Sequence, residues 1–311
     1  MAQDLSIEDP NAVYFITTRT IASRLWFVNN KKLEKYILAF LAKYQMTFGV
    51  IIYGFILMGN HYHLVAKFPN SNKADFLRAF NAIVAKLVPS CVPTFDGGRL
   101  WARRAKVQLL PMDQDVEHWA LYTALNPVSS GQVERYSQYP SYNSFADAAY
   151  QRVRNFELID WSDYNNRKRY NHNLKPIDCS KSYTLNYSKL PGYEKFTRKE
   201  YLKCLLEKAE DRRKEMVKKR RMDGKGFSNK KAILATKPGS KPKTTKTSER
   251  NTKRPLILTL CIETKRICLE KYFTILAAYK EASMRYRSGE NSIEFPIGTY
   301  KPIVYPTLLA T

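Results

Sequence analysis

Several features that would point to other protein classes are missing from this sequence. The five cysteines are scattered and never stand in CxxC spacing, so we expect reduced thiols and neither a zinc ribbon nor a disulfide framework. No stretch approaches the ~20 apolar residues needed to span a bilayer. The amino terminus lacks the basic start and apolar core of a signal peptide. We therefore expect a cytoplasmic protein without a membrane partner.

Acidic residues are too few to balance the basic ones, and the formal charge of the 311 residues is +24. Residues 1–150 carry 15 Lys and Arg against 11 Asp and Glu, whereas the remainder carries 37 against 17. The excess charge therefore belongs to the second half of the chain. Such an excess favours a polyanionic partner, and we expect nucleic acid. A solvated basic tail without a dedicated partner is the alternative.

Histidine is scarce, and two of the four histidines stand in the triplet His61-Tyr62-His63. The triplet opens an alternating apolar segment that is typical of a strand. Side chains alternate across a strand, so His61 and His63 share one face and Tyr62 lies on the other. Two imidazoles at this spacing can share a divalent cation, but they are an incomplete ligand set. Two partly exposed histidines without a ligand are the alternative.

A second group of polar residues follows about sixty positions later. Residues 115–126 are typical of a helix, which we expect Pro127 to stop. His118, Tyr122 and Asn126 lie four residues apart and form one stripe along that helix. A tyrosine hydroxyl that lies beside an amide and an imidazole can act as a nucleophile at a metal site. An amphipathic helix that packs Tyr122 inward explains the same spacing.

Together these segments resemble a known family. Met58–Val65 is similar to the histidine–hydrophobic–histidine (HUH) strand of single-tyrosine transposases, those related to insertion sequence 200. Residues 122–133 resemble their tyrosine helix, and Gly98–Arg104 and Tyr139–Ser144 resemble segments of the REP-associated (repeat-associated) branch. The motifs occur in the family's order over residues 12–145, about half of the chain.

The resemblance implies a mechanism. Tyr122 would attack a phosphodiester of single-stranded DNA and leave a covalent 5′-phosphotyrosine and a 3′-hydroxyl. His61, His63 and Asn126 would hold Mg²⁺ or Mn²⁺, which compensates for a phenol whose ordinary pKa is near ~10. His118 could assist proton transfer, although packing explains it equally well. The DNA is expected to form a stem-loop, and the protein to act as a monomer or homodimer.

The order of predicted elements indicates an α+β fold. It reads strand, helix, strand, strand, helix, strand, helix, which predicts a ferredoxin-like antiparallel sheet with helices on one face. The histidines would line the open face of that sheet, and the last helix would bring Tyr122 across to them. The predicted segments are the strands 13–18, 48–57, 62–68 and 106–110 and the helices 31–44, 74–87 and 115–126.

The second half of the chain is predicted to be a mostly helical, basic extension. We divide the sequence into a transposase domain (1–148), an aromatic-rich, partly helical extension (149–236), a flexible basic linker (237–255) and a helical region (256–311). In the extension, basic residues interleaved with aromatics suit single-stranded DNA, and an irregular segment that packs tyrosines on the first domain is the alternative. Basic residues in two places are DNA-binding candidates. They belong to the arginine-rich segment Gly98–Arg104 and to the end of a long helix: Arg99, Arg103, Arg104, Lys218, Lys219, Arg220 and Arg221.

Two other functions are compatible with these motifs. One is a domesticated protein that binds DNA hairpins without cutting them, and intact His61, His63, Tyr122 and Asn126 weigh against it. The other is an RNA-binding sheet domain of similar topology, whose usual basic-aromatic strand signature is not evident. Metal-dependent nicking of a stem-loop distinguishes the first from a transposase.

Overall fold

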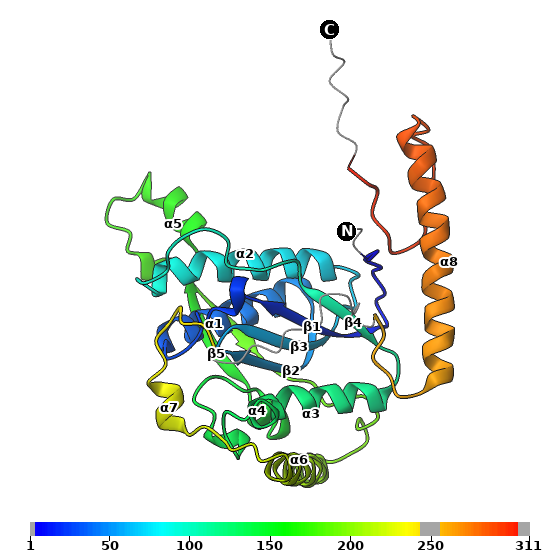
Figure 1. The fold of residues 1–311 in the computed structure, drawn as a ribbon. Helices are drawn as coiled ribbons and strands as arrows, with labels where there is room; N and C mark the ends of the chain where they lie inside the picture. Colours follow the sequence, from blue (N-terminus) through cyan, green and yellow to red (C-terminus); the bar gives the residue numbers. More distant parts are fainter. Residues whose placement is uncertain (1–3, 243–255, 304–311) are drawn as a thin grey trace.

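A four-stranded antiparallel sheet lies at the centre of the molecule (Figure 1). The computed structural model describes residues 4–242 and 256–303. The strands stand in the order β2-β3-β1-β4, and each neighbouring pair is antiparallel. Their bounds are β1 Val13–Arg19, β2 Ile51–Met58, β3 His61–Lys67 and β4 Lys106–Leu110, and the helices between and after them are α1 Lys31–Phe48, α2 Lys73–Cys91 and α3 Asp113–Ser129. This is the predicted order of elements, and the protein is a mixed α+β structure.

Helices α1 and α2 cover one face of the sheet. The strand residues that point to them alternate with those of the other face, as the period of two requires. Tyr14, Ile16, Tyr62 and Leu64 pack there in the largest apolar cluster. Helix α1 begins after Asn30, whose carboxamide oxygen accepts a hydrogen bond from the Leu33 backbone N–H (2.8 Å) and so caps the helix.

The opposite face carries the two histidines, and it is not open. Helix α3 crosses it, and α6 (Arg198–Met222) packs behind α3 (Figure 1). Only 8% of His61 and 6% of His63 is exposed. The histidine face is therefore not open as expected, and helices lie on both faces of the sheet and not on one. Apolar residues such as Phe15 and Val65 lie on the same face and are stabilised by burial from water. Leu121 and Ala124 of α3 pack on them.

The remainder of the described chain wraps around this sheet. A second, two-stranded antiparallel sheet packs on α1, and the predicted helical extension did not include it. Its strands are largely exposed and polar, so they lack the apolar alternation that identifies a strand in sequence. The remaining elements are α4 Phe145–Ala149, β5 Arg154–Ile159, α5 Trp161–Lys168, β6 Ser180–Leu185, α7 Lys230–Leu234, α8 Ile262–Arg287 and the short 3-10 turns Ile21–Ser23, Tyr136–Gln138 and Pro176–Cys179.

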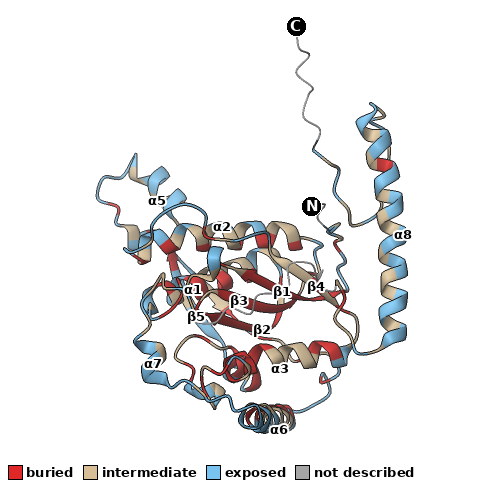
Figure 2. Cartoon of the chain, in the orientation of Figure 1, coloured by how far each residue is buried: buried red, intermediate tan, exposed pale blue. Residues whose placement is uncertain are grey.

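The two long helices of the second half are α6 and α8. Thr197 and Glu200 form a capping box at the start of α6, in which each side chain bonds the other residue's backbone N–H. Helix α8 stands beside the N-terminal segment and is mostly exposed (Figures 1 and 2). Of the predicted linker, residues 243–255 lie outside the described residues, and Gly239 packs on the buried Trp26. No helix in the described parts of the chain is long and apolar enough to cross a membrane.

Candidate functional site

Strand β3 brings the two histidine rings together beneath α3. His61 and His63 point to the same side of the strand, and their ring centroids lie 4.8 Å apart. The hairpin that precedes them is tied to the end of β1, because Thr20 N–H donates to the Asn60 carbonyl (2.9 Å). Gly59 is required in that hairpin, since an added Cβ would lie 2.8 Å from Val28. The histidine pair therefore has a fixed place on the sheet.

Neighbouring polar groups fix the tautomer of His61. The Asn60 amide donates through Nδ2 to the Ser23 carbonyl (2.9 Å), which turns Oδ1 toward His61 Nδ1 (2.6 Å). Because Oδ1 is only an acceptor, His61 Nδ1 must carry the proton. The lone pair of that ring is therefore on Nε2, the nitrogen that a metal would bind.

The same reasoning applies to His63. Its Nε2 lies 3.2 Å from Asn126 Nδ2, an amide nitrogen that can only donate. His63 Nε2 therefore carries the lone pair, and Nδ1–H donates to Thr17 Oγ1 (2.8 Å). Both hydrogen bonds are buried. The Thr17–His63 pair resembles the outer contacts that orient metal-binding histidines in other proteins.

Helix α3 carries the other two predicted residues to this place. Asn126 is buried against His63, and the Tyr122 ring centroid lies 5.8 Å from that of His63. Tyr122 is half-buried and also packs edge-on against Trp119 at 4.9 Å and Phe15 at 5.9 Å. The Tyr122 ring is thus only partly buried and lies beside the His63 ring.

Pro127 does not stop this helix, contrary to the prediction. Helix α3 continues to Ser129 because a proline near the C-terminal end removes only one backbone hydrogen bond. Ser130 N–H still donates to the Asn126 carbonyl at 2.9 Å. Asn126 is therefore held inside a helical turn and not at a frayed end.

The residues present suit a divalent cation with nitrogen and oxygen ligands. Each imidazole, with its proton on Nδ1, would offer Nε2 as a ligand, and a half-turn of the Asn126 amide would present Oδ1 in place of Nδ2. Among residues 4–242 and 256–303, no group of three His, Cys, Asp or Glu side chains stands together as a metal-binding set. Any metal at this place would therefore use the amide as its third protein ligand.

His118 lies apart from the histidine pair, toward α6. Arg212 NH1 stands 3.5 Å from His118 Nδ1 and 3.3 Å from the His118 carbonyl. Burial, followed by the nearby Arg212 charge, lowers the pKa of His118 below its ordinary value. The structure therefore places His118 between α3 and α6 and not with His61 and His63.

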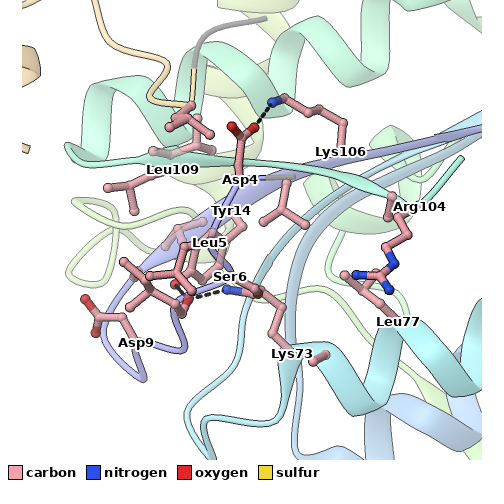
Figure 3. Close-up of a pocket in the computed structure, with 18 of the residues that line it drawn as sticks. Asp4, Leu5, Ser6, Asp9, Tyr14, Lys73, Leu77, Arg104, Lys106 and Leu109 are labelled. Atoms are coloured by element: carbon pink, nitrogen blue, oxygen red, sulfur yellow. Dashed lines mark hydrogen bonds and ion pairs between the residues drawn. The ribbon is translucent and has the colours of Figure 1, made fainter. Parts of the chain in front are cut away.

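The arginine-rich segment before β4 lies at the end of β1. Ala102 N–H donates to the Arg19 carbonyl (3.0 Å), and Arg19 pairs with His61 across the sheet. Arg99, Arg103 and Arg104 are exposed on this segment and line a cavity of about 1680 Å³ between β4, α2 and α8. Figure 3 shows Arg104 in this cavity, together with the Lys106–Asp4 ion pair at 3.0 Å.

The four basic residues at the end of α6 divide into two kinds. Lys218 and Lys219 are exposed. Arg221 pairs with Glu134 (2.9 Å), and the Arg220 guanidinium donates to the Ser129 and Gly226 carbonyls. Arg220 also lies so close to Gly131 that a Cβ there would be 2.0 Å away. Arg220 is therefore committed to packing, and the other three face solvent.

Sequence reasoning missed the residues that orient the site. Thr17 faces His63 only because β1 and β3 pair in that register, which no local pattern contains. Phe15 of β1 reaches Tyr122 only through the packing of α3 on the sheet, whereas Trp119 lies three residues before Tyr122 on the same helix. Asn60 is adjacent to His61 in the sequence, so its contact with the His61 ring is the one that could have been predicted from a local pattern.

Comparison with known proteins gives a distant similarity only. A scan against protein families and a search of curated proteins both find no match. A solved structure described as a REP-associated tyrosine transposase bound to a REP hairpin is similar over 47% of this chain and 84% of that chain. The identity is 15% and the TM-score 0.39, which describe a distant structural relationship.

Proposed function

We propose that this protein is a transposase-type enzyme that cleaves and rejoins single-stranded DNA. The convergence of His61, His63, Asn126 and Tyr122 supports the proposal most directly, because two separate elements carry them to one place. The strand order β2-β3-β1-β4, with β1 and β3 at the centre, also supports the proposal, because the ferredoxin-like layer expected for such an enzyme would have it. The substrate would be DNA with a stem-loop, at the hairpin-forming ends of an element.

The proposed reaction exchanges one phosphodiester for another. The Tyr122 oxygen attacks the phosphorus, and the bond from phosphorus to the 3′-oxygen breaks. The phenol loses its proton to water, and the departing 3′-oxygen gains one. The product is a 5′-phosphate joined to Tyr122, and the 3′-hydroxyl of another strand can reverse the step. Strand transfer follows without an external energy source.

Each residue of the site has a defined part in this scheme. His61, His63 and Asn126 would hold Mg²⁺ or Mn²⁺, and the bound ion would stabilise the charge that develops on the phosphate. Asn60 and Thr17 keep the two rings in the required tautomer. Phe15 and Trp119 restrict the Tyr122 ring beside His63. The site draws all of these residues from one chain, so a monomer would suffice.

Covalent capture tests the proposal. Wild-type protein is incubated with Mn²⁺ and a labelled single-stranded oligonucleotide that carries a stem-loop, and adducts are resolved under denaturing conditions. We expect an adduct for the wild type and for Tyr36→Phe, a surface tyrosine control, and none for Tyr122→Phe.

Two outcomes would contradict the proposal. An adduct that persists in Tyr122→Phe would show that Tyr122 is not the nucleophile. Tight hairpin binding by the wild type without any cleavage, across several stem-loops and both metals, would favour the domesticated binding protein instead.

A further inference from the structure

A projection between β5 and β6 lies outside the site described above. We call residues 160–179 the β5–β6 finger; it contains α5 and the turn Pro176–Cys179. Figure 1 shows α5 extending away from the central sheet, and Figure 2 shows that it is largely exposed. Strand β6, from which the finger projects, packs on α1. It therefore stands on the opposite side of the sheet from α3 and Tyr122.

The finger has a defined internal structure. The Asp160 side chain caps α5 by accepting from Asp163 N–H (3.0 Å). Lys168 Nζ donates to the His172 and Leu174 carbonyls and closes the turn after the helix. The Leu174 and Cys179 side chains are buried beneath it. The surface residues are therefore displayed on a folded support.

Large aromatic side chains are displayed on this support. Trp161 is 56% exposed and Tyr170 is 89% exposed. The nearby Tyr187 is buried, so aromatic residues of the same extension do pack where the fold offers a place. Aromatic surface left in solvent has a cost unless a partner covers it.

The charge of the finger and of the first residues of β6 indicates the chemistry of that partner. Residues 160–181 hold five Lys and Arg against three Asp. Asp160 pairs with Lys181 and Asp163 with Arg167, and the third carboxylate, that of Asp178, accepts from the Lys175 backbone N–H (2.8 Å). Lys168, Arg169 and Lys175 form no ion pair with another described residue. Proteins that bind single-stranded nucleic acid combine exposed aromatic rings, which stack on unpaired bases, with nearby basic side chains, which contact the phosphates.

We propose that the β5–β6 finger is a second binding site for single-stranded DNA, in which Trp161 and Tyr170 stack on unpaired bases. Arg169 and Lys175 contact the phosphates between them. The inference rests on the proposed function, since it assigns the finger to DNA that extends beyond the cleaved segment. The two can nevertheless be tested apart, because the finger does not touch Tyr122.

The experiment compares two double variants. Trp161→Ala/Tyr170→Ala removes the finger aromatics, and Phe273→Ala/Tyr300→Ala removes two exposed rings of the α8 region, 57% and 49% exposed. Affinity for a long single-stranded oligonucleotide is measured by fluorescence anisotropy at fixed salt. Alanine replacement of one stacking residue typically weakens binding by about tenfold. We expect a loss of at least about tenfold for the finger variant and none for the control.

Three further readings make the result specific. The loss should be absent for duplex DNA, and Mn²⁺-dependent cleavage of a short oligonucleotide should stay at the wild-type level. Bases should also quench tryptophan fluorescence in the wild type more than in Trp161→Phe. An affinity unchanged by the finger variant, or an equal loss for duplex, would overturn the finger site. Absence of cleavage in the wild type with a finger-dependent affinity would overturn the proposed reaction and leave the finger site standing.

Discussion

Neighbouring polar side chains set the ring orientation of both histidines of the candidate site. Asn60 holds the Nδ1 proton of His61, and Thr17 holds that of His63. Both arrangements place the lone pair on Nε2, although the two partners come from different parts of the sheet. Under the proposed function, the pair would therefore bind a cation without changing tautomer.

Thr17→Val tests whether the Thr17 hydroxyl orients the His63 ring. The substitution preserves shape and removes the acceptor of His63 Nδ1–H, so that ring loses its orientation. We expect Mn²⁺ affinity to fall by about 10–100-fold, measured by calorimetric titration. Thr47→Val is the control, because Thr47 bonds only its own helix at the Lys43 carbonyl. Equal affinities in both variants would show that Thr17 does not orient the ring.

His61→Ala separates metal binding from DNA binding. His61 is buried between β3 and α3, whereas the exposed cations lie on other elements. We expect the variant to lose Mn²⁺ binding, seen by electron paramagnetic resonance, and DNA cleavage, while it keeps most of its DNA affinity. Thr47→Ala, which changes an exposed residue of α1 outside the site and the finger, should keep all three properties. A parallel loss of DNA affinity and thermal stability would mean that His61 is structural.

At the scale of elements, α6 holds the helix that carries Tyr122. Lys208 donates to both Glu117 carboxylate oxygens (3.0 and 2.8 Å), and Tyr193 bonds the same carboxylate. Arg212 bonds the carbonyl of the next residue, His118. These contacts join the outer side of α3 to α6 while its inner side faces the histidines. The predicted stripe on α3 is therefore divided: His118 contacts α6, whereas Tyr122 and Asn126 contact His63 of β3.

The Glu117 contacts predict a pH dependence of stability. Burial acts to raise the pKa of Glu117, but the hydrogen bonds from Lys208 and Tyr193 outweigh it and hold the pKa below its ordinary 4.5. A lowered carboxyl pKa contributes stability above pH 4.5, and that stability is lost as the pH falls below it.

Glu117→Gln removes this contribution. We expect the variant to be less stable than the wild type near neutral pH by roughly 1–2 kcal/mol, since the charged hydrogen bonds are lost. The difference should shrink as the pH falls below 4.5, measured by denaturant unfolding at several pH values. Glu207→Gln is the control, since Glu207 is an exposed residue of α6 whose ion pair spans 4.0 Å. A difference independent of pH would exclude the Glu117–Lys208 pair as its source.

At the scale of the whole molecule, the exposed cations lie on several elements around the sheet. They include the arginine-rich segment, the end of α6 and the β5–β6 finger. Arg220 is the exception, since its guanidinium packs against Gly131. Charge counted along the sequence therefore overstates the basic surface at the end of α6 by one residue.

Lys218→Ala/Lys219→Ala tests whether the end of α6 binds phosphate. Each phosphate contact that is lost should reduce the slope of log affinity against log salt by about 0.7–0.9, so we expect a reduction of up to about twice that value. The control Lys265→Ala/Lys280→Ala makes the same charge change on α8, where both lysines are exposed. Equal slopes in the two variants would show that net charge alone, and not this place, governs binding.

The sequence by itself determined the local elements and the faces of the site. Period-two alternation put His61 and His63 on one side of β3, and helical spacing put Tyr122 and Asn126 on one stripe of α3. Asn30 and Thr197, residue types that favour the first position before a helix, also cap α1 and α6. These features depend on residues that are close in the chain, so a local pattern is sufficient to predict them.

Only the tertiary structure decided what surrounds those residues. It placed α3 and α6 over the histidine face, turned His118 toward Arg212, carried α3 past Pro127 and paired β5 with β6. It also selected Thr17 as the partner of His63. Strand register and helix packing join residues far apart in the chain, and the energy that selects them comes from burying whole faces together. No short segment of the sequence contains that information.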